Sequence, residues 1–429
     1  MNNFKATTLG IQHLLAMYAG AILVPLIIGG ALNFDSAQLT YLVAIDIMMC
    51  GIATLLQVWK GKFVGIGLPV VLGCTFTAVS PIIAIGTTGG LGDIYGAIIA
   101  SGIIIVVISG IFGLLVPFFP PVVTGSVVTI IGVSLIPVAI NNMGGGQDAA
   151  DFASGSNVAL AFITLLIILV IYRFSTGFIR AISILLGLVL GTIVGGFMGK
   201  VSFDPVVEAS WLHVAQPFYL ATPTFDLSAI ITMTLVAMVS LVESTGVYYA
   251  LSDICKKDLT SKDLSKGYRA EGLASIIGGI FNAFPYTTFS QNVGLIQMSG
   301  VRDRKVIFIT GGMLLVLGFL PKVAALTTII PTPVLGAAML AMFGMVITQG
   351  IKMLAPEIMK SMENAMVAAI AVGLGVGVSV VPGLFAALPT TFGLNILTSN
   401  GIVCGSVTAI FLNIVFNMIG PKKEDPMHF

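Results

Sequence analysis

The stretch Phe284-Pro-Tyr-Thr-Thr-Phe-Ser-Gln-Asn-Val-Gly-Leu-Ile-Gln-Met-Ser-Gly300 is a polar segment in a chain that otherwise reads as nearly continuous apolar helix. Its Tyr, Thr and Phe residues favour extended backbone. Hydrocarbon offers no partner to a backbone N–H or C=O, so irregular backbone survives at membrane depth only where protein or a polar ligand satisfies it. We therefore expect this segment to line a cavity and to form the binding site.

The composition indicates an all-α polytopic membrane protein. Hydrophobic residues make up 57% of the 429 residues and charged residues 9%, with a mean hydropathy of +1.08. A soluble domain carries roughly 25% charged residues. The net charge of +1 and the absence of basic runs interleaved with aromatic residues argue against nucleic-acid binding.

The four cysteines are scattered along the chain. Cys50, Cys74 and Cys404 lie in apolar runs, and Cys255 precedes two lysines. This spacing suggests neither a disulfide framework nor a metal site. We expect packing roles for the cysteines, and no metal or cofactor.

Apolar segments of about 20 residues, the length of a membrane-spanning helix, can be counted along the chain. We expect fourteen, near residues 9–30, 38–58, 67–86, 94–115, 120–140, 157–172, 180–199, 228–251, 270–284, 288–299, 305–321, 331–350, 363–381 and 401–420. Cytoplasmic loops collect Lys and Arg. With a cytoplasmic N-terminus, only Lys200 and Lys322 of the nineteen Lys and Arg fall outside. This pattern predicts an even number of spans and two cytoplasmic termini.

Two sequence motifs recur at nearly the same offset. Thr75-Phe-Thr77 matches Thr288-Phe-Ser290 at a spacing of 213 residues, and Pro120-Pro-Val-Val-Thr-Gly125 matches Pro331-Thr-Pro-Val-Leu-Gly336 at 211. Seven segments is an odd number, so the halves would have opposite orientation, and the matching broken segments would meet near the bilayer midplane. We predict an inverted 7+7 repeat. Chance recurrence of short motifs is the alternative, which two pairs and the odd segment count disfavour.

Three acids lie within predicted spans: Asp46, Glu243 and Glu271. A charge near the centre of a membrane helix costs roughly 2.5 to 3.5 kcal/mol on insertion scales. Glu243 is the deepest, so it is the strongest functional candidate and suits a group that takes up and releases a proton. For Asp46 and Glu271 a purely structural hydrogen bond is an equal alternative, and Glu271 could also be a first-turn acid favoured by the helix dipole.

Three further polar residues lie in or beside the spans. His13 lies near the cytoplasmic end of the first span, where a structural hydrogen bond is the favoured role. Gln291 and Asn292 are adjacent amides that can present donors and acceptors to a planar, amide-like ligand, although they could simply satisfy the helix break. The spans hold no Lys or Arg to bind an obligatory anion, and helix N-termini supply only a weaker positive field.

The chain resembles the nucleobase-ascorbate transporters along its whole length. Gln291-Asn-Val-Gly294, followed by Ser299-Gly300, is similar to the signature of that family. The stretches that resemble its xanthine and uric-acid permease branch are Gln12-His-Leu-Leu-Ala-Met17, Gly65-Ile-Gly-Leu-Pro-Val-Val-Leu-Gly-Cys-Thr-Phe-Thr-Ala-Val79, Glu243-Ser-Thr-Gly246 and Ala270-Glu-Gly272.

The resemblance implies a core domain and a gate domain. The core would comprise residues 1–115 and 228–325, and the gate would comprise residues 116–227 and 326–429, including a cytoplasmic tail. Short antiparallel strands from the third and tenth segments would meet at the substrate site, and the gate would mediate homodimerisation.

The resemblance also implies site residues. The substrate-binding residues would be Glu243, Gln291, Phe76, Ser290 and Thr75.

Glu243 and Glu271 would couple transport to protons, while His13, Asn292 and Asp46 would support the site. Many purine-transporting members have a polar residue four positions after the Glu243 equivalent, where this chain has Val247, so no role is assigned to Val247. Thr75 replaces an Asn of some xanthine-selective members and resembles those with looser pockets.

The predicted function is proton-coupled uptake of xanthine across the inner (cytoplasmic) membrane by a homodimeric transporter. No phosphate-binding loop for ATP and no motif of an intramembrane enzyme is present in the sequence. Uric acid or a broader purine range is an alternative substrate. An anion carrier or a passive channel is an alternative of another class.

Overall fold

The computed structural model describes residues 2–146, 149–385 and 400–419. The helices are α1 (Asn3–Ala31), α2 (Ser36–Val58), α3 (Val79–Gly89), α4 (Leu91–Ile108), α5 (Phe112–Leu115), α6 (Pro121–Met143), α7 (Gly155–Phe174), α8 (Gly177–Ala181), α9 (Ser183–Phe197), α10 (Asp204–Glu208), α11 (Leu227–Cys255), α12 (Ser261–Ile280), α13 (Ser290–Ser299), α14 (Arg304–Gly318), α15 (Pro321–Thr328), α16 (Thr332–Ile358), α17 (Met362–Val380) and α19 (Gly401–Asn413). The strands and short helical turns are β1 (Leu72–Cys74), β2 (Tyr286–Thr288), η1 (Phe76–Ala78), η2 (Val116–Phe118), η3 (Pro382–Phe385) and the π-helical η5 (Ile414–Met418).

Within the described residues, nine helices are long and apolar enough to cross a membrane. A tenth span results if α14 and α15, which are bent by 81° at a short break, are taken together. In the described part of the chain, a helix overlaps each of the fourteen predicted ranges. The chain is therefore an all-α polytopic membrane protein with nine or ten long apolar spans and several shorter helices.

The predicted start of the ninth segment, residue 270, is wrong. Helix α12 begins at Ser261, because Thr260 and Asp263 form a capping box that satisfies the first backbone N–H groups. Glu271 therefore lies in the middle of α12, and the alternative that it is a first-turn acid is also wrong. The basic residues Lys262, Lys266 and Arg269, expected in a loop, lie on this helix.

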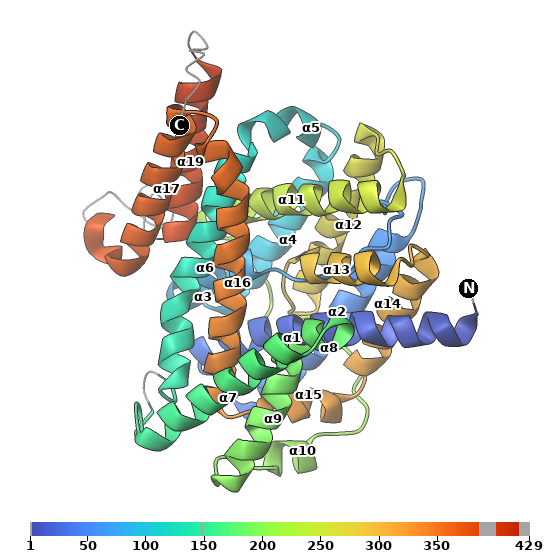
Figure 1. Cartoon of the computed structure of the whole chain (residues 1–429), viewed down its shortest axis with the longest axis vertical. Helices are drawn as coiled ribbons and strands as arrows, with labels where there is room; N and C mark the ends of the chain where they lie inside the picture. The colour runs from blue at the N-terminus through green and yellow to red at the C-terminus, as the bar shows by residue number, and fades with distance from the viewer. Residues whose placement is uncertain (1, 147–148, 386–399, 420–429) are drawn as a thin grey trace.

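The helices form two groups (Figure 1). Helices α6 and α16 pack along each other, with α7, α17 and α19 around them, while α1, α2 and α14 pack together near the N-terminus. The α6–α16 contact is close because small residues line it: a Cβ on Gly336 would lie 2.3 Å from the Met143 nitrogen. The two Pro/Gly motifs that recur in the sequence begin these two helices.

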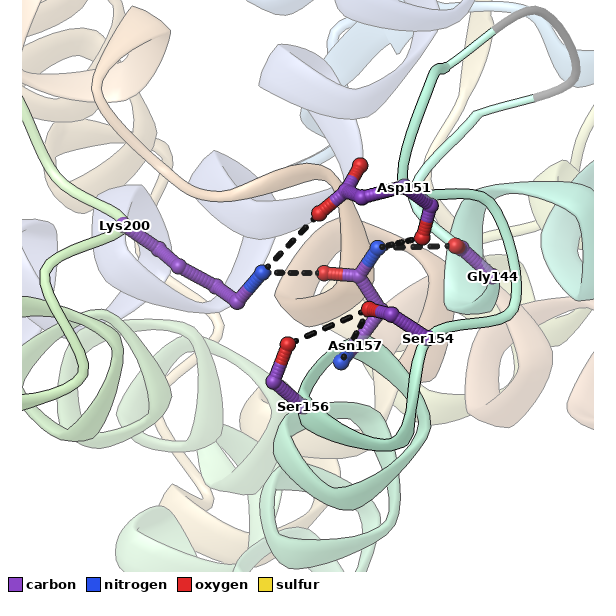
Figure 2. A network of polar contacts seen from close by, with 6 residues as sticks. All are labelled: Gly144, Asp151, Ser154, Ser156, Asn157 and Lys200. Carbon is purple, nitrogen blue, oxygen red and sulfur yellow. Dashed lines mark hydrogen bonds and ion pairs between the residues drawn. The ribbon is translucent and has the colours of Figure 1, made fainter.

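Lys200, one of the two lysines that depart from the predicted charge pattern, is paired (Figure 2). Its Nζ lies 3.2 Å from Asp151 Oδ2 and 2.5 Å from Asn157 Oδ1. Asn157 in turn donates to the backbone oxygens of Gly144 and Asp151. The hydrogen bond from Lys200 lowers the pKa of the Asp151 carboxyl below its ordinary value. This network ties the α6–α7 connection to the end of α9.

Lys322 is the other exception. Its Nζ donates to the backbone oxygens of Val206 and Val207, at 2.8 and 3.2 Å, and lies 5.2 Å from the centre of the Trp211 ring. Both lysines thus have specific partners in the protein.

Candidate functional site

The site is built on a two-stranded antiparallel sheet. Strands β1 and β2 pair in the register Leu72 to Thr288, Gly73 to Thr287 and Cys74 to Tyr286. The pairing continues beyond the strands, since Phe289 N donates to Val71 O and Thr75 N donates to Pro285 O. The predicted pair of short antiparallel strands is confirmed, and β2 begins two residues before the predicted tenth segment.

Gly73 is required at the centre of this sheet by the Phe289 ring. A Cβ on Gly73 would lie 2.3 Å from a ring carbon of Phe289, and a Cβ on Gly20 of α1 would lie 2.6 Å from the same ring. The ring is thereby buried between α1 and β1. It anchors the turn that leads from β2 to Ser290 and Gln291.

Each strand leads directly into a short helix. After β1 the chain enters η1 and α3, with the Thr75 hydroxyl accepting from Thr77 N at 3.3 Å. After β2 it enters α13 at Ser290. The N-termini of such half-helices present free N–H groups and a partial positive charge to the site.

Helix α11 brings Glu243 to this region, because α11 packs against both η1 and α13. Glu243 is half-buried on α11, whereas Ser290 and Gln291 are exposed in the first turn of α13. Among the described residues, neither the Glu243 carboxyl nor the Gln291 amide has a hydrogen-bond partner in the protein. Their donors and acceptors are free to bind a ligand.

Phe76 lies in η1, beside helix α16. Its ring is partly buried and meets Phe343 of α16 edge to face, with ring centres 5.9 Å apart. The predicted stacking residue therefore lies next to a helix of the α6–α16 group.

The Thr75 hydroxyl takes part in a buried cluster. It lies 2.5 Å from Thr77 Oγ1 and 3.3 Å from Ser240 Oγ, and Thr77 Oγ1 lies 2.8 Å from Ser240 Oγ. Thr75 is 1% exposed. Its side chain joins β1 to α11, so a ligand would meet mainly the backbone at this position.

His13 and Asn292 contact each other. Asn292 Nδ2 lies 3.1 Å from His13 Nδ1 and donates to His13 O at 3.0 Å, while Asn292 Oδ1 is buried without a partner. This contact fixes α13 against α1.

Asp46 lies behind the sheet. It is fully buried, accepts a hydrogen bond of 3.1 Å from the Tyr286 hydroxyl and lies 3.8 Å from Cys50 Sγ. Asp46 therefore links α2 to β2, and it is not in contact with the exposed end of α13.

Glu271 has donors for both carboxylate oxygens. Ser244 Oγ donates to Oε2 at 3.0 Å, and the Tyr248 hydroxyl donates to Oε1. Gln57 Nε2 donates to the Tyr248 hydroxyl and, at 3.3 Å, to Gly267 O. A cavity of about 20 Å³ beside Glu271 and Ser240 has room for one water molecule.

Four of these polar residues were not predicted from the sequence: Ser240, Ser244, Tyr248 and Gln57. Ser240, Ser244 and Tyr248 recur every fourth residue along α11, which places them on one face of the helix. A polar residue at every fourth position of an apolar helix could have predicted a polar face on this helix. No sequence pattern points to Gln57, because it is a single amide near the end of α2.

Together, the broken helices, the paired strands and the intramembrane carboxyls define a membrane transporter. The family model for the xanthine/uracil permeases, described as "Permease family", matches residues 4–384. The chain belongs to this family, and it is a transporter and not an enzyme.

Three relatives match over almost their whole length. A nucleobase transporter, PlUacP, of Paenibacillus larvae is 60% identical, covering 100% of this chain and 98% of the relative. The xanthine permease of Bacillus subtilis is 61% identical, covering 98% and 95%. The uric acid permease PucK of the same bacterium is 58% identical, covering 99% and 98%.

Solved structures share the fold at low sequence identity. The transmembrane domain of the cyanobacterial bicarbonate transporter BicA is 15% identical, with a TM-score of 0.61 over 96% of this chain and 98% of that one. The murine anion transporter Slc26a9 in its inward-facing state is 12% identical, with a TM-score of 0.62 over 96% and 68%. The fold is that of the 7+7 repeat transporters.

Proposed function

We propose that the protein imports xanthine together with protons by alternating access. The observation that carries this proposal is the pair of unpartnered polar groups, the Glu243 carboxyl and the Gln291 amide, beside a half-helix N-terminus. Membership of the permease family, and relatives named for purine transport, support a purine substrate.

The geometry suggests how a purine would bind. Glu243 would accept hydrogen bonds from ring N–H groups, and the Gln291 amide would address an N–H and C=O edge. Backbone groups near Thr75 and Ser290 would complete the contacts, with Phe76 stacking on the ring. Glu243 and Glu271 would carry the proton coupling.

Transport would move the core, residues 1–115 and 228–325, against the gate, residues 116–227 and 326–429. Fourteen segments in an inverted 7+7 repeat are supported by the pairing of β1 with β2 and by the packing of α6 on α16, since the elements that carry or adjoin the recurring motifs pack on each other. We further propose a homodimer in the cytoplasmic membrane with both termini inside. The distribution of Lys and Arg along the sequence supports this orientation.

Xanthine and uric acid differ by one oxygen on the purine ring, and relatives named for each are almost equally similar. Xanthine is the preferred substrate in our proposal, with uric acid as the second candidate.

The test is uptake of radiolabelled xanthine into cells that express the chain, with and without a protonophore. Uric acid, uracil, guanine and sulfate are added as competitors. Uptake that collapses with the protonophore and is competed by purines supports the proposal. Uptake competed only by sulfate would favour an anion carrier, and uptake that neither saturates nor responds to the proton gradient would favour a channel.

A further inference from the structure

Ser244 lies between Glu271 and strand β2. Its Oγ is 3.0 Å from Glu271 Oε2 on one side and 3.0 Å from Thr287 Oγ1 on the other. Thr288 also reaches this oxygen, through its hydroxyl at 3.2 Å and its backbone N–H at 3.4 Å. A single buried hydroxyl therefore joins an intramembrane acid to both threonines of the strand that leads to Gln291.

The two oxygens of Glu271 have different partners. On Oε1, the Tyr248 hydroxyl is a fixed donor, because its own oxygen accepts from Gln57 Nε2. Gln57 cannot be turned round without placing its oxygen against Gly267 O, which can only accept. Oε1 consequently remains an acceptor, and a proton on Glu271 belongs on Oε2.

Ser244 has one hydrogen and two acceptors within reach. With Glu271 ionised, that hydrogen goes to Oε2, and Thr287 donates to Ser244. With Oε2 protonated, Glu271 becomes the donor to Ser244 Oγ, and the Ser244 hydrogen turns to Thr287 Oγ1. Thr287 must then direct its own hydrogen elsewhere, so the change reaches β2 without any net loss of a hydrogen bond.

We propose that Ser244 is a positioning residue that transmits the protonation of Glu271 to strand β2 and thereby to the substrate site. The inference rests on the proposed proton-coupled function. The turn that begins at Phe289 continues from β2 to Gln291, three residues beyond Thr288. The reversed hydrogen bond at Thr287 acts at the base of that turn.

Few other groups near Glu271 could transmit its protonation to β2. The titratable groups that interact with it in the described structure are Tyr248 and Glu243 of α11 and Tyr268 of α12. Tyr268 is bonded to Thr245 at 2.7 Å. Helix α4 presents only Gly102 and Ile105 to the cavity beside Glu271.

The test uses the full-length protein in proteoliposomes with an imposed pH gradient. Ser244→Ala is expected to lower the steady-state accumulation of xanthine about tenfold, which is the effect of losing one hydrogen bond on an equilibrium. Exchange of internal for external xanthine, which needs no net proton movement, should continue. The number of protons taken up per xanthine, measured with a trapped pH dye, should fall, and accumulation should lose its dependence on external pH.

Three variants serve as comparisons. Ser244→Thr keeps the hydroxyl and should restore coupling. Thr287→Val removes the far end of the bridge and should uncouple transport in the same way, which keeps the test decisive if Ser244→Ala fails to fold. Ser275→Ala removes a hydroxyl that bonds only the Glu271 backbone oxygen, at 2.9 Å, and should behave like the parent.

Parent-like accumulation and proton uptake in Ser244→Ala would overturn the inference. Loss of exchange in a well-folded Ser244→Ala protein, or equal uncoupling by Ser275→Ala, would also overturn it, since either result indicates a general packing role. If the parent itself shows no proton dependence, the proposed function fails, and that outcome is visible before any variant is compared.

Discussion

The residues Glu243 and Glu271 occupy neighbouring helices but have opposite hydrogen-bonding environments. Glu271 receives donors on both oxygens, whereas Glu243 has none from the described protein. A buried or half-buried carboxylate without partners is costly, so its hydrogen bonds must come from another molecule. Because of this contrast, we place the substrate at Glu243 and assign Glu271 to proton coupling.

Replacing Glu243 by Gln tests the first of these roles. Loss of charge-assisted hydrogen bonds worth about 1.5 to 3 kcal/mol should weaken xanthine binding by about 10- to 100-fold. Proton-driven accumulation should be abolished. Binding is measured by calorimetry on the purified protein, with Glu363→Gln of α17 as a control for loss of a carboxylate elsewhere. Full uphill uptake by Glu243→Gln would remove Glu243 from the site.

Gln291 is expected to set ligand selectivity. Gln291→Glu replaces a group that both donates and accepts by one that, when ionised, only accepts. The order in which xanthine, uric acid, guanine and uracil compete for uptake should therefore change. Gln297→Glu makes the same exchange at an exposed position of the same helix and should leave that order intact. An unaltered order of competition in Gln291→Glu would show that Gln291 does not contact the substrate ring.

At the scale of elements, the strand pair depends on close approach between backbone and ring. Gly73→Ala would place a methyl group 2.3 Å from a Phe289 ring carbon. Overpacking of this kind costs about 1 to 3 kcal/mol. We expect a lower melting temperature in detergent and impaired uptake. Gly312→Ala, on α14 with open space around the added methyl, should change neither. An unchanged melting temperature in Gly73→Ala would contradict the close packing of this sheet.

The connection between α6 and α7 depends on a charge pair. Lys200 lowers the pKa of Asp151, so the pair contributes stability above the ordinary Asp pKa of about 3.9, and this contribution is lost as the pH falls through the lowered value. Lys200→Gln should therefore lower the melting temperature slightly at neutral pH, and the difference from the parent should vanish in acid and at high salt. A difference that is constant with pH would exclude the pair as its source.

For the whole molecule, the proposed orientation places the segment around α10 outside and the loop after α11 inside. In a variant without the four native cysteines, Glu208→Cys should react with an impermeant maleimide on intact cells. Asp258→Cys should react only after the cells are permeabilised. Both residues are exposed, so accessibility within the fold does not limit the labelling. Reversed labelling would invert the proposed topology.

The elements that carry or adjoin the two recurring sequence motifs pack on each other in the folded chain, as α6 on α16 and as the β1–β2 sheet. The start of α6, at Gly125, contacts the end of α16 at Leu354. The start of α16, at Gly336, contacts the end of α6 at Met143. Glycines allow close approach in both places, because a Cβ would lie 2.3 Å from the Met143 nitrogen at Gly336 and 2.3 Å from a Phe289 ring carbon at Gly73.

The sequence alone determined the membrane class, the positions of the helices and the break at residues 284–290, because hydropathy and proline act locally on the backbone. Its resemblance to a known family also implied the strand pair, and the apolar surroundings of the acids marked them as candidates. Hydropathy predicts a start of α12 near residue 270, whereas the helix begins at Ser261, because a capping box extends it through polar residues.

The way in which the polar groups share their hydrogen bonds follows from the packing of the helices. That Glu271 is satisfied and Glu243 is not, that Thr75 turns towards Ser240, and that Ser244 bridges Glu271 to β2 all depend on contacts between helices far apart in the chain. Composition and spacing determine which groups are buried. The partner of each buried group depends on distances of about 3 Å between elements, which arise only when the helices have packed.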